Sequence, residues 1–229
     1  MLKIEIWYDK PAETDVDFSW LGLSKELGGC SQNAMDYAPY PQVLALMEYA
    51  RPDVILTVDG KPFLILELTQ MNPSGHNLPQ RFSCLVRAAE LGVPAVYYYL
   101  EMARRSESDP NPRYVNIRVP LAQLRLVDIF DTPSVSIVWP TDKKTLQAAV
   151  RAASHQHLAD FVDHAVRLAH ADKRLTSADP IVKARYAEMK DLTLKYYGST
   201  YNNNSSYNDV VKTGHCASDK LIGKRVSPP

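Results

Sequence analysis

One turn motif constrains the fold of this chain more than any other feature of its sequence. The dipeptide Asp59-Gly60 stands between two runs of aliphatic and β-branched residues, at 53–58 and 63–68. Asp and Gly both tolerate the positive φ angles of the tight turns that join antiparallel strands. The sequence therefore predicts a β-hairpin over residues 53–68.

A helix and a further strand are expected after the hairpin. Pro79 lies where a helix would start, and Gly92 is placed to end it. The apolar stripe of this helix comprises Phe82, Leu85, Val86 and Ala89. Residues 93–100 are apolar and aromatic, as in a strand. A strand, a helix and a strand at this spacing form a crossover between parallel strands, so the sheet is expected to be mixed.

The remaining elements follow from shorter patterns. Alternation over residues 3–8 predicts a half-buried strand, and residues 41–50 a short helix. The apolar face of that helix is expected to hold Val43, Leu44, Met47 and Ala50. Residues 134–139 are expected to form a strand, 141–170 and 180–197 helices, and 103–114 an exposed loop.

These elements predict an α/β fold, with a mixed central β-sheet flanked by helices and a helical C-terminal region. We expect a core over 1–140 and a helical extension over 141–198. Residues 199–229 begin with an Asn- and Ser-rich linker. Their basic end is expected to be a tail or the start of a further domain.

Composition excludes several classes of protein. The chain has 26 basic and 26 acidic residues and 45% hydrophobic residues, unlike disordered, collagen-like or histone-like chains. Its apolar stretches are far shorter than the roughly 18 residues of a membrane span. The first residues lack the charged and apolar regions of a signal peptide, so we expect no secretory leader, and Cys30, Cys84 and Cys216 have no metal-binding spacing. We therefore expect a cytoplasmic protein with reduced thiols that serve in packing, and no membrane partner.

Charge is distributed unevenly along the chain. Residues 1–50 contain 3 basic and 8 acidic residues, whereas residues 51–229 contain 23 and 18. The longer part is therefore modestly basic, which by itself is only weak evidence for a polyanion partner.

Two carboxylates lie at the open end of the predicted hairpin. Asp53 begins its first strand and Glu67 ends its second. Acidic side chains at the ends of buried strands need a counter-charge, and Mg²⁺ is commonly held by one or two carboxylates. A strict two-residue turn pairs Asp53 with Leu66 and directs the carboxylates to opposite faces. A three-residue loop or one β-bulge pairs Asp53 with Glu67 on one face. The metal site therefore requires the longer loop or the bulge. The alternative is that both carboxylates are simply solvated residues at the ends of strands.

Arg51-Pro52-Asp53, the hairpin and Glu67-Leu68-Thr69 together resemble the PD-(D/E)xK nuclease superfamily, which includes many type II restriction endonucleases. In that superfamily Pro-Asp opens one strand, the next strand carries the second acidic residue, and a lysine follows two places later. Asp53 and Glu67 match the acidic positions, and Thr69 stands in place of the lysine. Residues 72–82, with Ala88-Ala89 and residues 92–97 after them, also resemble a pattern of uncharacterised or restriction-type members.

The resemblance implies a restriction endonuclease-like core with a metal site. Asp53, Glu67 and the Leu68 carbonyl are expected to hold Mg²⁺, or Mn²⁺ as an alternative, with Glu48 as a further ligand from the preceding helix. Thr69 offers only a hydroxyl. Arg81 is the first candidate to replace the missing positive charge, ahead of Lys61 at the turn.

Neighbouring polar residues are assigned roles by the same resemblance. Gln80, in the first turn of a helix, is expected to bind phosphate, since helix N-termini attract anions. His76 has the pKa range for proton transfer, and Asn77 is expected near DNA. The candidates for DNA-backbone contact are Arg104, Arg105, Lys143 and Lys144. All of these residue types also serve simply as solvated surface.

The expected function is Mg²⁺-dependent hydrolysis of double-stranded DNA by an endonuclease of a prokaryotic or phage cell. One site cuts one strand, so cutting both requires a homodimer or a second event. Two alternatives remain open. The chain is either a non-catalytic DNA-binding or assembly domain of the same fold, or an unrelated α/β enzyme that uses Asp53 and Glu67 as acid and base.

Overall fold

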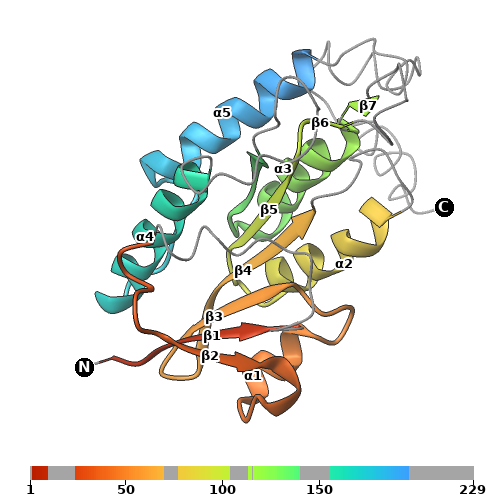
Figure 1. Cartoon of the computed structure of the whole chain (residues 1–229). Helices are drawn as coiled ribbons and strands as arrows, with labels where there is room; N and C mark the ends of the chain where they lie inside the picture. Colours follow the sequence, from red (N-terminus) through yellow and green to blue (C-terminus); the bar gives the residue numbers. More distant parts are fainter. Residues whose placement is uncertain are drawn as a thin grey trace, which may run out of the picture.

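A mixed six-stranded sheet forms the centre of the molecule (Figure 1). The computed structural model describes residues 2–9, 24–69, 77–103, 113–114, 116–139 and 155–195. The sheet has the order β2-β1-β3-β4-β5-β8. Its strands are β1 (Ile4–Tyr8), β2 (Ser31–Ala34), β3 (Val54–Val58), β4 (Lys61–Thr69), β5 (Ala95–Leu100) and β8 (Ser134–Trp139). A separate two-stranded ladder joins β6 (Met102–Ala103) and β7 (Arg113–Tyr114).

Five α-helices accompany the sheet in the described part of the chain. They are α1 (Pro41–Leu46), α2 (Asn77–Glu90), α3 (Arg118–Phe130), α4 (Gln156–His170) and α5 (Pro180–Lys195), with a 3₁₀ turn at Met35–Tyr37. No helix among the described residues is long and apolar enough to cross a membrane. The α/β class and the mixed sheet are thus confirmed.

The order of strands gives the sheet an antiparallel half and a parallel half. Strands β1, β3 and β4 pair antiparallel, β5 and β8 continue parallel to β4, and β2 is parallel to β1. Helix α2 makes the predicted crossover from β4 to β5, and α3 precedes β8.

The predicted hairpin contains both a two-residue turn and a β-bulge. Asp59 and Gly60 have φ angles of 47° and 76°, and Val58 pairs with Lys61. The register then shifts, so that Leu56 pairs with Leu64 and Phe63 is the extra residue of the bulge. Proline is tolerated at such irregularities because it has no N–H to donate, which suits Pro62 beside the bulge.

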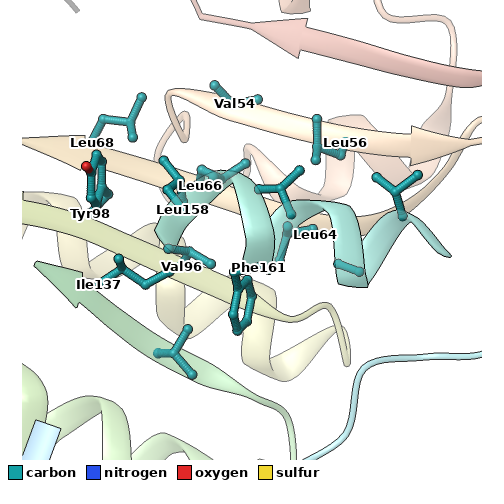
Figure 2. Packing of buried hydrophobic residues seen from close by; sticks show 14 of the residues in the cluster. Val54, Leu56, Leu64, Leu66, Leu68, Val96, Tyr98, Ile137, Leu158 and Phe161 are labelled. Atoms are coloured by element: carbon teal, nitrogen blue, oxygen red, sulfur yellow. The ribbon is translucent and has the colours of Figure 1, made fainter. Parts of the chain in front are cut away.

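Two layers of helices bury the two faces of the sheet. Helices α1, α2 and α3 contribute to a cluster with the odd-numbered residues of the central strands, such as Ile55, Ile65 and Tyr97. Helix α4 covers the opposite face, which holds even-numbered residues of β3, β4 and β5. Its Leu158 and Phe161 pack against residues such as Leu66 and Val96 there (Figure 2). Helix α5 packs against β8 and α3 and adds residues to both clusters.

The C-terminal helices are therefore a layer of the core in the described structure. Phe161 and Val162 of α4 belong to one cluster with Leu66 of β4 and Val96 of β5. The predicted boundary at residue 140 stays a prediction, because residues 140–154 lie outside the described part. Residues 199–229 lie outside it as well.

Several predictions about single elements were wrong. Strand β1 is buried at all five positions rather than on one face, because its residues pack into both core clusters, one on each face of the sheet. Its Glu5 is 3% exposed and accepts a hydrogen bond from the Tyr40 hydroxyl. Helix α1 ends at Leu46 and leaves Leu44 51% exposed. A helix of six residues is too short for an apolar period to define its face.

The sequence analysis also missed elements. It assigned nothing to α3, whose Pro120 lies in the first turn, where a missing N–H costs little. The expected loop over 103–114 has paired ends, in β6 and β7. Helix α2 begins two residues before Pro79, and α5 ends at Lys195. The part of the 141–170 helix that is described starts at Gln156.

Candidate functional site

The bulge brings the two carboxylates of the hairpin to one face. Val54 pairs with Leu66, and the same register extended by one residue sets Asp53 opposite Glu67. The Asp53 side chain is 21% exposed and that of Glu67 is 3% exposed. Asp53 Oδ2 also accepts a hydrogen bond of 2.6 Å from the Leu68 N–H. The bulged alternative of the two registers is thus the one that occurs.

Arg81 forms ion pairs with both of these carboxylates. Its Nη1 is 2.7 Å from Glu67 Oε1 and 3.3 Å from Asp53 Oδ2. The same nitrogen is 2.7 Å from the Leu68 carbonyl oxygen. Arg81 reaches the site from α2, which packs against β4 and β5. Two carboxylates and one carbonyl therefore converge on a single nitrogen. We call Asp53, Glu67 and the Leu68 carbonyl the cradle.

Burial raises the pKa of both carboxyl groups of the cradle. Burial raises the pKa of Glu67 well above its ordinary value, and the charge of Asp53 raises it further, while Arg81 opposes both. Burial also raises the pKa of Asp53, against the Leu68 N–H and Arg81. The guanidinium of Arg81 thus opposes the effect of burial on both carboxyl groups without cancelling it.

One oxygen of the cradle remains without a partner. Glu67 Oε2 is buried and makes no hydrogen bond with any described residue. A buried carboxylate oxygen in this state is unfavourable unless a proton, a ligand or a cation completes it. Within the described residues, no group of three or more His, Cys, Asp or Glu side chains could hold a metal ion. A cation here would thus have two carboxylates and one carbonyl as ligands, with solvent or substrate for the rest, as suits Mg²⁺.

Thr69, which stands in place of the lysine, is tied to a tyrosine. The Thr69 hydroxyl lies 3.1 Å from the Tyr97 hydroxyl, and both residues are buried. Tyr97 pairs with Glu67 across the parallel strands β4 and β5, and burial raises its pKa to about 12. The sequence analysis placed Tyr97 in the strand expected over residues 93–100 and gave it no role in the site. The parallel register of β4 and β5, which places Tyr97 beside Glu67, could have indicated that Tyr97 belongs to the site.

Comparison of the chain with protein-family models, curated proteins and solved structures finds no match. The resemblance to the nuclease superfamily therefore rests on the residues of the sequence.

Two predicted residues lie elsewhere. Glu48 is exposed and forms an ion pair with Arg87, whose guanidinium also lies over the ring of Tyr49, 5.2 Å from its centroid. The ion pair with Arg87 does not support the predicted role of Glu48 as a metal ligand. Lys61 lies at the turn end of β4, beside a cavity of about 400 Å³ that borders the C-terminal end of α4. It is remote from the cradle along the strand.

The remaining predicted residues, or their side chains, lie outside the described part of the chain. His76, Arg104, Arg105, Lys143, Lys144 and Cys216 lie outside the described residues. Asn77 and Gln80 lie in the first turn of α2, and their side chains are outside the described part. Of the predicted site, the structure brings together Asp53, Glu67, Thr69 and Arg81, with Tyr97 as an addition.

Proposed function

We propose that this chain is a Mg²⁺-dependent endonuclease with a restriction endonuclease-like core, and that it hydrolyses double-stranded DNA. The observation that carries the proposal is the cradle itself. A β-bulge turns Asp53 and Glu67 to one face, and the Leu68 carbonyl joins them at one point. The antiparallel β1-β3-β4 arrangement, followed by α2 and the parallel strand β5, also supports it.

The residues of the cradle fit a hard divalent cation. Asp53 Oδ2, Glu67 Oε1 and the Leu68 oxygen would hold it, and the unpartnered Glu67 Oε2 adds acceptor capacity. When bound, Mg²⁺ supplies Lewis acidity for activating water and offsets the charge that develops on the phosphate.

The chain's own residues carry the rest of the proposed reaction. Arg81 contributes positive charge toward the phosphate, the part that the family's lysine plays at the position of Thr69. The Thr69 hydroxyl, oriented by Tyr97, positions water or a phosphate oxygen through a hydrogen bond. Gln80 is proposed to bind phosphate, and His76 to take part in proton transfer.

The wider interface is proposed on charge. Asn77, Arg104, Arg105, Lys143 and Lys144 are candidates for contact with DNA, and a homodimer would supply the second site for cutting both strands. Such an enzyme would act in the cytoplasm of a prokaryotic or phage-infected cell.

A plasmid-nicking assay tests the proposal. Supercoiled DNA is incubated with the protein in separate reactions that contain Mg²⁺, Mn²⁺ or a chelator. We expect metal-dependent relaxation or linearisation that falls by about 10²–10³-fold in Asp53→Asn and in Glu67→Gln. Glu90→Gln is the matched control: it changes a carboxylate of α2 that pairs with Arg87 and whose side chain is 30% exposed, and we expect it to keep full activity. Cutting that persists in either cradle variant would exclude this site.

A non-catalytic DNA-binding or assembly domain of the same fold is the second candidate. The observation in its favour is that Arg81 already fills the cradle and that Thr69 has no positive charge. DNA retention at low salt in a gel-shift assay, without cutting under any metal, would favour this second function.

A further inference from the structure

Arg81 makes the contacts that a bound cation would make. Its Nη1 lies within 3.3 Å of all three oxygens of the cradle. A guanidinium nitrogen that is shared among two carboxylates and a carbonyl has the position of a central ion rather than of one partner in a peripheral ion pair.

The guanidinium and a divalent cation exclude each other at this position. Mg²⁺ needs oxygen ligands at about 2.0–2.1 Å, so ligation by these oxygens takes the space of Nη1. Two positive groups at such short range also repel. A divalent cation balances two carboxylates by itself, so the charge of Arg81 is no longer needed once the cation is bound.

Arg81 has a way out of the cradle. Its side chain is 37% exposed, whereas that of Glu67 is 3% exposed. It projects from the second turn of α2, whose N-terminal end favours anions. A released guanidinium therefore stays beside the cradle, within reach of a phosphate that approaches this end of the helix.

We propose that Arg81 is an internal counter-ion that closes the cradle until a divalent cation displaces it, and that the released guanidinium then binds a phosphate of the substrate. This inference rests on the proposed function. It makes Arg81 both a competitor of the metal and a positioning residue for the phosphate.

Mn²⁺ binding, followed by the electron paramagnetic resonance signal of the free ion, tests the competition without any cleavage. The apparent Kd equals the Kd of the open cradle divided by the fraction of molecules in which the cradle is open. If the cradle is open in about one molecule of ten, binding is weakened by about tenfold. Arg81→Met should therefore bind Mn²⁺ about tenfold more tightly than the wild type. Glu67→Gln added to Arg81→Met should abolish that gain.

Arg87→Met is the matched control. It removes the same charge from the same helix, but Arg87 pairs with Glu48 and Glu90 away from the cradle. We expect wild-type Mn²⁺ affinity in this variant. If Arg87→Met tightens binding as much as Arg81→Met, the effect is one of net charge, and the inference is wrong.

A second measurement keeps the test valid if Arg81→Met is poorly stable. Arg81→Lys retains a cation, so it should bind Mn²⁺ more weakly than Arg81→Met. The melting temperature of Arg81→Met should also rise with Mn²⁺ by more than that of the wild type. Equal or weaker Mn²⁺ affinity in Arg81→Met, or no binding in either protein, overturns the inference.

The outcome separates this inference from the proposed function. Metal-dependent cutting by the wild type, with unchanged Mn²⁺ affinity in Arg81→Met, retains the nuclease and rejects the counter-ion. Tighter binding in Arg81→Met without cutting by the wild type retains the counter-ion and rejects the nuclease.

Discussion

Replacing Arg81 by methionine should destabilise the protein through the carboxylates that it leaves behind. Methionine keeps much of the aliphatic stem but removes all three contacts to the cradle. Breaking a fully buried ion pair costs about 3–5 kcal/mol. Because the side chains of Arg81 and Asp53 are 37% and 21% exposed, water compensates part of this loss. We therefore expect roughly half of it, about 2 kcal/mol.

Arg87→Met is the control for the loss of stability expected in Arg81→Met. Arg87→Met breaks pairs with Glu48 and Glu90, whose side chains are 58% and 30% exposed. Such surface pairs are worth about 1 kcal/mol or less. Urea unfolding followed by circular dichroism measures both variants. With a slope of about 2 kcal/mol per M, Arg81→Met should unfold at about 1 M less urea than the wild type.

The pH dependence of the deficit has a defined sign. The pKa of Glu67 is raised in the folded protein, so protonation favours the folded state, and stability falls as pH rises toward that pKa. Loss of Arg81 removes an influence that lowers this pKa. The deficit of Arg81→Met should therefore be largest at neutral pH and shrink as the solution is acidified. Equal midpoints for Arg81→Met and Arg87→Met at pH 7, or a deficit that grows in acid, would refute the reasoning.

Three further predictions concern the scaffold. Cys84 is 1% exposed, and burial raises its pKa to about 12, so a thiol reagent at pH 8 should label it only after unfolding; rapid labelling of its peptide, seen by mass spectrometry, would contradict this. Phe161→Ala should lower the free energy of unfolding by about 3–4 kcal/mol, and Phe130→Ala, at a 37% exposed position, by less than about 1 kcal/mol. Asp163→Ala should cost about 2–3 kcal/mol, because its carboxylate accepts hydrogen bonds from the Ser24 hydroxyl and two backbone N–H groups; an unchanged melting temperature would rule that out.

Local patterns in the sequence predict much of the core because they depend on neighbouring residues. The turn at Asp59-Gly60 follows from φ preferences, and the crossover through α2 follows from an apolar run, a helix and a second apolar run. Short or weakly periodic segments were not predictable in this way. Helix α1 shows this for side-chain direction, and α3 for the existence of an element.

The sequence by itself determined the hairpin, the mixed sheet and the two carboxylates at one end of it, since these depend on residues close together in the chain. Only the tertiary structure decided that a bulge at Phe63 turns Asp53 and Glu67 to the same face. It also decided that Arg81 fills the cradle and that Tyr97 holds Thr69. The physical reason is that the β3–β4 register depends on how the two strands pair over their whole length, and that the contacts of Arg81 and Tyr97 depend on how α2 and β5 pack against β4.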